Sequence, residues 1–422
     1  MQAGFAILEA GSVAQKNSGM VLLKNLIDVC VGTLAWYFLG FGIAYGVKED
    51  PSKFTGGSKF AAASFLKTDS EDGIAGTTAF RDWFFQWAFC ATAATIVSGG
   101  VTERMALPCY IWYSIIMTGI IYPFVVYWTW SGQGWLTIGS GEDADNADGY
   151  SDFAGSGIVH LVGGIGALTG AAVLGPRKGR WEHPEDFKPS NAHLVVLGTF
   201  ILWFGWYGFN CGSQLRMESE ADATAAALVA MNSTLAAAAG GLVVFTLRLA
   251  QSGAKGPVEY DLCGMCNGIL AGLVAICAGV ANVEPSMAIV TGLVGGIFEE
   301  LGHFLLLALK VDDPLDAFPV HGCGGIAGIL TRPLFDWSGA KDTMFGWHCI
   351  GLGSIGAWVA VWSLFLMGIM KVIGKSKPGL FRISAEEEET GGDTKLSHSP
   401  VKPYEKDTIW NDPAPAPASH EM

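Results

Sequence analysis

Two histidines lie in copies of one short motif. Residues 159–165 and 320–326 both read Val-His-x-x-Gly-Gly-Ile, which places His160 and His321 in equivalent positions. An imidazole donates and accepts protons near neutral pH, because its unperturbed pKa is about 6.5. Both motifs lie inside apolar stretches, where an ionisable side chain is a candidate functional residue. The repeat predicts a proton-handling site; the alternative is that each histidine only forms a hydrogen bond between helices.

Aromatic residues recur at helical spacing. Phe85 and Phe89 are four residues apart, so they share one helix face. Trp206, Phe209 and Ser213 also share one face, at i, i+3 and i+7. Such stripes more often pack in the core or form belts at the membrane interface than bind ligands. We assign that simpler role to three other tryptophans: Trp203, Trp358 and Trp362.

Trp130 stands beside an acidic loop. It closes an apolar run, and Tyr122 lies two turns before it. The following loop, 131–153, has no Lys or Arg but carries these carboxylates: Glu142, Asp143, Asp145, Asp148 and Asp152. An indole face holds a small cation by about 0.5–2 kcal/mol, and an acidic mouth concentrates cations. For the first four carboxylates the alternative is an ordinary solvated loop.

Asp152 lies eight residues before His160, on roughly the same helix face. Two roles are open for it. It could bind a cation directly, or it could cap the helix that begins near 151–155 and order the preceding loop.

The composition indicates that these residues lie in a membrane. Of 422 residues, 50% are hydrophobic and only 15% are charged, against about 25% charged in a soluble domain. A net charge of −14 makes nucleic acid an improbable partner. The nine cysteines form no disulfide framework. No nucleotide-binding, metal or nucleophile–base motif supports an enzyme, so we expect no cofactor and no bound metal.

Cutting the chain at its charged residues predicts the membrane spans. Uncharged runs of 18 or more residues can each cross about 30 Å of hydrocarbon as a helix, and they cover 29–47, 83–102, 105–141, 153–176, 189–215, 223–247, 262–283 and 343–370. Run 105–141 should be helical only to about Trp130. Two further spans are 286–309, interrupted by Glu299 and Glu300, and the short 317–331. Segment 1–15 resembles the second half of a helix, so we expect a truncated first helix before ten full spans.

The two histidine motifs lie five spans apart, so their helices run in opposite directions. This is the arrangement of an inverted repeat, whose functional site usually lies near the midplane between the halves. We therefore expect an all-α polytopic transmembrane domain over 1–373. It should consist of repeat one (about 1–176), repeat two (about 189–334) and a final helix (about 343–373).

Residues 374–422 form a tail of different character. The distribution of Lys and Arg predicts that the tail is cytoplasmic and the N-terminus is outside. Its start is basic and apolar, and we expect it to dock on inner loops, including 175–188 and 310–316. An acidic run follows at 386–389, and prolines alternate with alanine near the end. We expect disorder towards that end.

Longer stretches carry a resemblance to a known family. They read GFAILEAGSVAQKN (4–17), FFQWAFC (84–90), TERM (102–105), DFAGSGIVH (152–160), GWYGFNCGS (205–213) and DDPLDAFPVHGCGGIAG (312–328). The chain resembles the ammonium transporter (Amt/Mep/Rh) family, and its eukaryotic Amt branch in particular. The resemblance implies a plasma-membrane homotrimer whose subunits each hold a pore between two inverted five-helix halves.

The resemblance also implies roles for individual residues. Ammonium would be recruited by Trp130, Phe89 and Ser213, supported by Asp152. Phe85 or Phe89 would form a gate with Phe209. Trp206 and Tyr122 would line the pore, and His160 and His321 would be its histidine pair. Segment 379–384 resembles the regulatory tail of the family. Independently of the resemblance, a cytoplasmic regulator or kinase could act on the tail, with phosphate added at Thr394 or Ser397.

The function implied is recruitment of ammonium, its deprotonation, and passage of ammonia with or without the proton. Two alternatives remain open. One is a neutral gas channel like the Rh proteins, and the other is an ammonium sensor that signals through its tail.

Overall fold

The computed structural model describes residues 1–47, 53–65, 78–138, 149–337 and 342–397, and these residues are almost entirely helical, with no β-strand among them. Among the described residues, a π-helical turn lies inside two helices, α2–η2–α3 and α5–η4–α6, and begins two others, η5–α8 and η7–α13. The elements are α1 (Gln2–Ser12), α2 (Ser18–Ala35), η2 (Trp36–Gly40), α3 (Phe41–Tyr45), α4 (Ala79–Val101), α5 (Leu107–Ile116), η4 (Met117–Ile121), α6 (Tyr122–Trp130), α7 (Trp135–Ile138), η5 (Ser156–Leu161), α8 (Val162–Leu174), α9 (Ala192–Gly212), α10 (Glu220–Lys255), α11 (Leu262–Ile276), α12 (Pro285–Leu309), η7 (Phe318–Cys323), α13 (Gly324–Phe335), α14 (Asp342–Ser376) and α15 (Ala385–Thr390).

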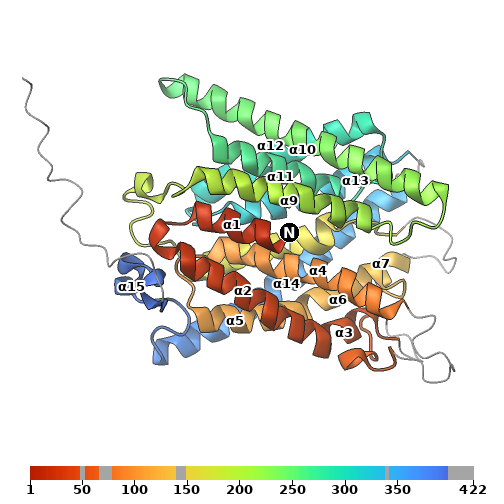
Figure 1. The fold of residues 1–422 in the computed structure, drawn as a ribbon, viewed down its shortest axis with the longest axis horizontal. Helices are drawn as coiled ribbons and strands as arrows, with labels where there is room; N and C mark the ends of the chain where they lie inside the picture. The colour runs from red at the N-terminus through yellow and green to blue at the C-terminus, as the bar shows by residue number, and fades with distance from the viewer. Residues whose placement is uncertain (48–52, 66–77, 139–148, 338–341, 398–422) are drawn as a thin grey trace, which may run out of the picture.

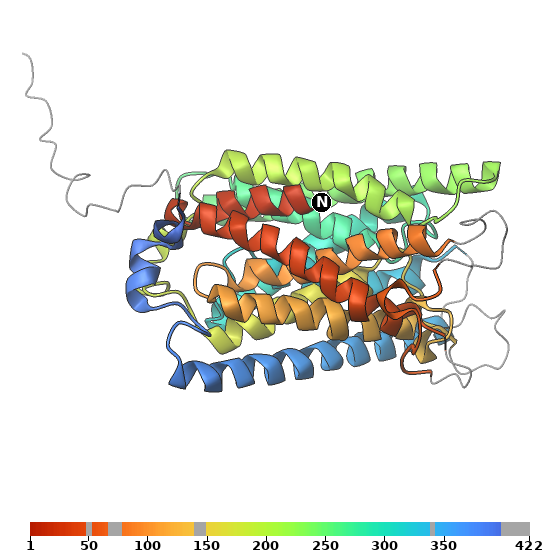
Figure 2. The same cartoon turned by 60° about the horizontal axis from the view of Figure 1, so that its bottom comes forward.

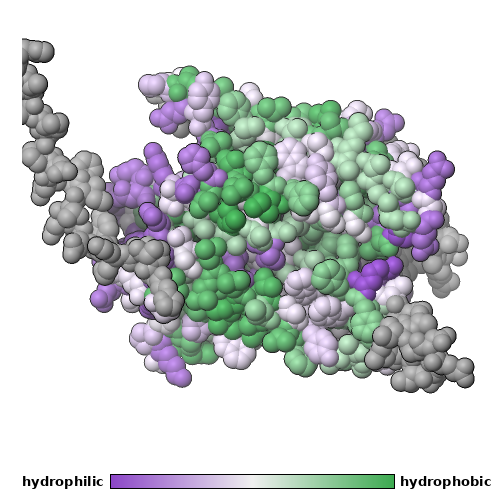
Figure 3. Space-filling model, in the orientation of Figure 1, coloured by the Kyte–Doolittle hydropathy of each residue, from purple (hydrophilic) through white to green (hydrophobic). Residues whose placement is uncertain are grey.

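The helices lie side by side in one bundle, with polar ends and an apolar middle (Figures 1 and 3). Within the described residues, eight helical segments are long and apolar enough to cross a membrane. Helix α1 begins halfway across the bundle and runs towards the end that carries α15 (Figure 1). We call that end the tail face and the end that carries α7 the opposite face. Helix α14 runs along one edge from face to face (Figure 2).

The sequence-based boundaries hold for most spans, but α10 continues to Lys255 where 247 was predicted, and α11 ends at Ile276 where 283 was predicted. The largest error concerns one start. The span predicted at 29–47 begins at Ser18, because α2 contains Lys24 and Asp28 within the bundle. Both side chains are buried, and hydrogen bonds to polar groups of neighbouring helices compensate for the burial. Charge alone therefore misplaced the start of this helix. The final helix continues to Ser376, three residues past the predicted end.

Small residues set the closest helix contacts. A methyl group at Gly4 would lie 2.7 Å from Leu202 Cγ, and one at Gly198 would lie 2.6 Å from the Leu8 nitrogen, so α1 and α9 touch backbone to backbone. Close approach at small residues is the usual basis of helix association in lipid. Helix α1 is thereby held at the centre of the molecule.

Candidate functional site

The two motif histidines meet at the centre of the bundle. His160 lies in η5 and His321 in η7, and both are buried. Their Nδ1 atoms are 3.2 Å apart, and the rings are nearly parallel, with an angle of 14° and a centroid separation of 5.3 Å. At that distance one ring can donate a hydrogen bond to the other. The pair therefore forms a direct polar contact between the two halves of the chain.

The glycines of the motif explain why the rings can come so close. A methyl group at Gly164 would lie 2.3 Å from the Gly322 nitrogen, and one at Gly325 would lie 2.5 Å from the Ser156 carbonyl oxygen. These two glycines occupy the same motif position, and each meets the backbone of the other motif's helix. Any larger residue would separate the helices and the histidines with them.

Asp152 caps the first histidine helix. Its Oδ1 and Oδ2 accept hydrogen bonds from the four backbone N–H groups of residues 155–158, at 2.8–3.1 Å. Gly155 has a φ of +98°, which favours glycine and turns the chain around the carboxylate. Tyr150 Oη donates a further bond of 3.1 Å to Oδ2. Of the two roles left open by the sequence, this geometry supports helix capping.

Asp313 is a residue that sequence reasoning missed. It lies eight residues before His321, as Asp152 lies eight before His160. Its Oδ1 and Oδ2 accept bonds from the N–H groups of Ala317 and Phe318 at 3.0 and 2.8 Å. Burial raises the pKa of Asp313 to about 6. Extending the motif comparison backwards by eight residues would have revealed it.

A column of aromatic rings leads from the opposite face to the histidines. Trp130 packs edge-on against Phe89, with ring centroids 5.6 Å apart. Phe89 stacks on Phe209 at 3.9 Å, and Phe209 lies 5.6 Å from the ring of His160. Phe85 lies 4.6 Å from Phe89, on the side away from the histidine. The stacked Phe89 and Phe209 rings close the column at this point.

The column begins at a cavity of about 470 Å³ on the opposite face, which Trp130, Phe85 and Ser213 help to line. Trp130 is held in place because its Nε1 donates to the Asp152 carbonyl oxygen at 2.8 Å. The Ser213 hydroxyl donates to the Phe209 carbonyl at 2.9 Å, so its oxygen can still accept a bond. Residues 142–148 of the acidic loop lie outside the described residues.

The two remaining predicted pore residues lie in different places. Trp206 is stacked on His160, with an angle of 14° and a centroid distance of 5.3 Å, and its Nε1 donates to Cys277 Sγ at 3.2 Å. Tyr122 lies apart from the column, with its ring 6.3 Å from that of Trp36. The structure therefore brings together every predicted site residue except Tyr122.

Comparison with known proteins decides the family. The sequence model described as the Ammonium Transporter Family matches residues 1–399. The chain belongs to the ammonium transporter family. It is 40% identical over 395 residues to a putative ammonium transporter of Synechocystis, covering 93% of this chain and 84% of the relative. It is 36% identical over 421 residues to ammonium transporter 1 member 3 of Solanum lycopersicum, covering 93% and 88%.

Solved structures agree with this assignment. A protein described as a sensor Amt protein superimposes with a TM-score of 0.81 at 30% identity, covering 94% of both chains. Candida albicans Mep2 gives a TM-score of 0.75 at 25% identity, covering 92% of this chain and 84% of Mep2. The chain is thus an ammonium transporter and a multi-pass membrane protein, and it is not an enzyme.

The carboxylates in span 286–309 of this ammonium transporter have a structural partner. Arg248 of α10 pairs with Glu299, Glu300 and Asp261. Nearby, His303 Nδ1 lies 2.9 Å from Asp316 Oδ1. The sequence could not identify Arg248 as the partner, because it lies on another helix about fifty residues away. The charge of Arg248 compensates for the burial of Glu299 and Glu300, which explains how two glutamates fit into the apolar helix α12.

The tail of the transporter docks on three segments of the tail face. Backbone bonds join Ile383 to Arg104 at 3.0 Å and Phe381 to Ala106 at 3.1 Å. Arg382 donates to the carbonyls of Leu174 and Pro176 at 2.8 and 2.7 Å. Asp393 accepts bonds from two N–H groups, those of residues 19 and 20, at the start of α2.

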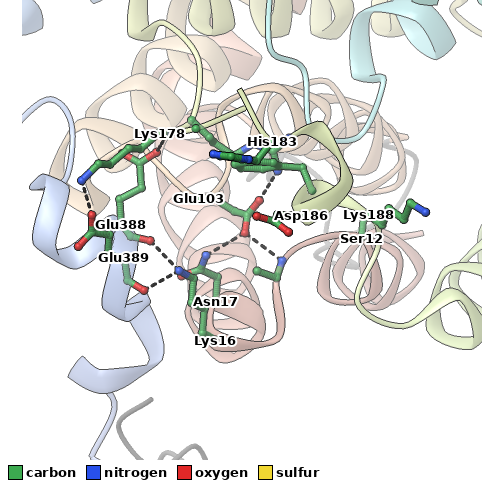
Figure 4. Close-up of a pocket in the computed structure, with 14 residues that line it drawn as sticks. Ser12, Lys16, Asn17, Glu103, Lys178, His183, Asp186, Lys188, Glu388 and Glu389 are labelled. Atoms are coloured by element: carbon green, nitrogen blue, oxygen red, sulfur yellow. Dashed lines mark hydrogen bonds and ion pairs between the residues drawn. The ribbon is translucent and has the colours of Figure 1, made fainter. Parts of the chain in front are cut away.

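The acidic run is part of this contact. Lys16 Nζ donates to the backbone carbonyl oxygens of Glu388 and Glu389 in α15, at 2.9 and 2.6 Å, beside the cavity that these residues line (Figure 4). The carboxylates of the two glutamates bind Lys178 through its backbone N–H and its ammonium group. The predicted docking on 175–188 matches these contacts. The tail contacts described above end on 16–20, 104–106 and 174–178. Within loop 310–316, the other predicted docking segment, Asp312 pairs with Arg177. Residues 398–422 lie outside the described part of the chain.

Proposed function

We propose that ammonium enters at the cavity beside Trp130, loses a proton, and passes as ammonia between the rings to the His160–His321 pair. The observation that carries this proposal is the continuous column of rings that ends on two imidazoles with nitrogens 3.2 Å apart. Trp130 and Phe89 offer π faces to the cation, and the Ser213 oxygen accepts a hydrogen bond from it.

Deprotonation follows from the cost of moving a charge into this column. A charged group at the centre of a membrane costs from about 2.5 to more than 10 kcal/mol. Neutral ammonia avoids that cost and needs only the displacement of the stacked Phe89 and Phe209 rings. The proton left behind can cross the same barrier on the imidazoles, since each ring nitrogen that gives up a proton can accept another.

His160→Ala tests the relay. We expect the variant to lose coupled ammonium transport or to become a leaky cation pathway, because the chain of proton-accepting nitrogens is broken. Currents and uptake in proteoliposomes measure both results, with His193→Ala, at an exposed position near the start of α9, as control. A folded variant with unchanged rate and unchanged selectivity for ammonium over potassium would refute the relay.

The assembly and orientation are further parts of the proposal. We propose a homotrimer in the plasma membrane, with halves at about 1–176 and 189–334, each subunit having its own pore. The tail face would be cytoplasmic and the Trp130 cavity extracellular, in line with the Lys and Arg distribution. Light scattering on the detergent-solubilised protein tests the trimer. Protease digestion of the tail in right-side-out vesicles tests the orientation, because a cytoplasmic tail would be protected.

A signalling role is a second candidate, which the docked tail favours. The tail is bonded to 104–106 and 174–178, which directly follow α4 and α8, and α8 follows the His160 turn. A change in the pore could thus alter how the tail docks and how a cytoplasmic regulator or kinase reaches it. Rescue of ammonium uptake in a transport-deficient cell distinguishes a transporter from a sensor, since a sensor with little flux would not rescue growth. A neutral gas channel would rescue it without current.

A further inference from the structure

A small cavity adjoins His321 on the side away from the ring column. Its volume is about 30 Å³, enough for a water molecule. His321 lines one side of it, and Phe5, Glu9 and Asn267 are among the other lining residues. Phe5 packs against His321 with ring centroids 6.0 Å apart, and Glu9 follows one turn later on the same face of α1. A carboxylate therefore borders the space next to the second imidazole.

Glu9 is bound in a way that leaves one oxygen available. The side chain is buried, with 1% of its surface exposed. Ser98 Oγ donates to Oε2 at 2.7 Å, and Asn25 Nδ2 donates to the same atom at 3.3 Å. Among the described residues, both of these hydrogen bonds to the carboxylate end on Oε2, so Oε1 is the oxygen that can bind a proton or water from the cavity.

The surrounding cluster contains more carboxylates than cations. Asp28 of α2 accepts bonds from Ser114 Oγ at 2.5 Å and Thr95 Oγ1 at 2.7 Å. Lys24 interacts electrostatically with both Glu9 and Asp28, and its ammonium lies 3.4 Å from the Ser98 carbonyl oxygen. One buried lysine balances one of the two carboxylates. Since an unbalanced buried charge is costly, the other carboxylate gains from holding a proton.

Unpartnered polar atoms lie around the same cluster. In the described part of the chain, Asn25 Oδ1, Gln2 Nε2 and Thr102 Oγ1 are buried without a hydrogen-bond partner. Buried polar atoms in native proteins are normally satisfied by protein or by ordered water. These atoms therefore mark positions where water can connect the cluster to the cavity.

We propose that Glu9 is the acceptor that takes the transported proton from His321 and releases it towards the tail face. This inference rests on the proposed histidine relay and extends it by one residue. The N–H bond of the His321 imidazolium breaks, its electron pair stays on nitrogen, and an O–H bond forms on Glu9 Oε1, directly or through one water. Glu9 then gives the proton to water and returns to the carboxylate, so proton and charge balance in each cycle.

An exit exists on the same helix. Ser12 lies three residues after Glu9, which is about 4.5 Å further along α1. Ser12 lines a cavity of about 360 Å³ on the tail face, with Lys16, Glu103 and Lys188 (Figure 4). A proton released from Glu9 thus reaches a solvent-accessible cavity within one helical turn.

The test compares Glu9→Gln, Glu9→Asp and the parent chain in proteoliposomes that contain a luminal pH dye. Glutamine keeps the shape and the hydrogen bonds of the carboxylate but cannot take up a proton. We expect Glu9→Gln to lower the ammonium-evoked current at least tenfold, since a positioned proton-transfer group typically contributes about 10²–10⁴-fold. The lumen of Glu9→Gln vesicles should become alkaline, because ammonia that arrives without its proton takes up a proton from luminal water, whereas the parent chain delivers ammonia and proton together. The ammonium concentration that gives half-maximal current should stay within about twofold, because Glu9 is remote from the recruitment cavity.

Glu9→Asp keeps a titratable group, and we expect it to restore a large part of the current with a shifted pH profile. Glu300→Gln, which removes a buried carboxylate of α12 paired with Arg248, is the matched control. It loses an ion pair and some stability, but its current at matched protein content should stay parental. Parental current and a parental luminal pH response in Glu9→Gln would overturn the inference. If Glu9→Gln fails to assemble, an unchanged pH profile in Glu9→Asp would overturn it. A parent chain that moves ammonia without current and makes the lumen alkaline would instead refute the relay itself.

Discussion

At the scale of single residues, the neighbours decide which of several possible roles a side chain has. Asp152 could have bound a cation, but its oxygens are occupied by the backbone N–H groups of 155–158 and by Tyr150. Its carbonyl oxygen, in turn, holds the Trp130 indole. The aspartate therefore acts on the candidate recruitment site by positioning Trp130 and the first histidine helix.

Trp130→Leu tests the recruitment role. Leucine fills much of the space but has no π face, so about 0.5–2 kcal/mol of cation binding should be lost. We expect weaker discrimination at low ammonium, with a smaller effect on maximal flux. Uptake measured over a range of ammonium concentrations checks this, with Trp362→Leu as control. Equal concentration dependence in the Trp130→Leu variant and the parent would make Trp130 an interfacial belt residue only.

Asp313→Ala tests whether the second histidine helix depends on its cap. Alanine removes the acceptor for the N–H groups of Ala317 and Phe318, and loss of such a cap costs about 0.5–2 kcal/mol. We expect a lower melting temperature and altered ammonium selectivity, because His321 follows this turn. Asp313→Asn keeps an acceptor oxygen and should lie closer to the parent. Identical melting curves for Ala and Asn variants would mean that the cap contributes nothing.

The sequence places the two histidines in equivalent motif positions, and the structure brings their rings together. The same spacing continues back to Asp152 and Asp313, but most residues in between differ, so the short motif alone does not single out Asp313. The contact of the rings and the role of Glu9 were beyond reach. Both depend on which helices lie next to each other, and spacing along one helix does not contain that information.

At the scale of elements, most spans could be predicted because apolar length is a direct requirement of the bilayer. The start of α2 was predicted too late because charged residues lie inside this span. Its Lys24 and Asp28 look like the end of a span, but Glu9, Thr95 and Ser98 on neighbouring helices compensate for their burial. The π-helical turns that hold both histidines were equally unpredictable. They are favoured by tertiary contacts at the crossing of η5–α8 with η7–α13.

The loops on the tail face form a buried ion-pair network that can be tested through Asp312. Burial alone would raise its pKa, but the bonds from Arg177 and the charge of Arg104 outweigh burial and lower the pKa to about 2. Asp312→Asn removes one of the two carboxylates that pair with Arg177. Breaking a buried ion pair lowers the free energy of unfolding by about 3–5 kcal/mol. We expect a large drop in melting temperature at neutral pH.

The pH dependence of this contribution has a definite sign. The folded-state pKa of Asp312 lies below its ordinary value of 3.8. Its stabilising contribution is therefore complete above about pH 4 and is lost as the pH falls through about 2. The stability difference between parent and Asp312→Asn should stay constant from pH 8 to 5. A difference that already shrinks between pH 7 and 5 would show that another group is responsible.

At the scale of the whole molecule, the tail joins parts of the chain that are far apart in sequence. It bonds to the start of α2 through Asp393 and to the loops after α4 and α8 through 381–383. The sequence predicted a docking segment at 374–385. It did not predict that the acidic run would become a docked helix, because its partners Lys16 and Lys178 come from distant segments.

Two truncations test the tail. Removing 386–422 deletes α15 and Asp393 but keeps the contacts of 381–383, so we expect a trimer that still inserts and has altered activity. Removing everything after 373 deletes all of these contacts and should reduce uptake more severely. Phosphate at Thr394 would add about −1.5 to −2 charges next to Asp393 and the α15 carboxylates, and should loosen docking. Full and identical uptake by both truncations, at matched surface expression, would make the tail a passive extension.

The stacked rings of Phe89 and Phe209 also bear on how a membrane potential would act on transport. Together with the buried imidazoles they separate the cavity on the opposite face from the cavity on the tail face. An applied potential falls mainly across the region between two such cavities, so a proton that crosses it moves through most of the electrical distance of the membrane. The work available is then close to the full value of about 2.3 kcal/mol per elementary charge per 100 mV. The resting potential of the cell would thereby set how steeply ammonium is accumulated.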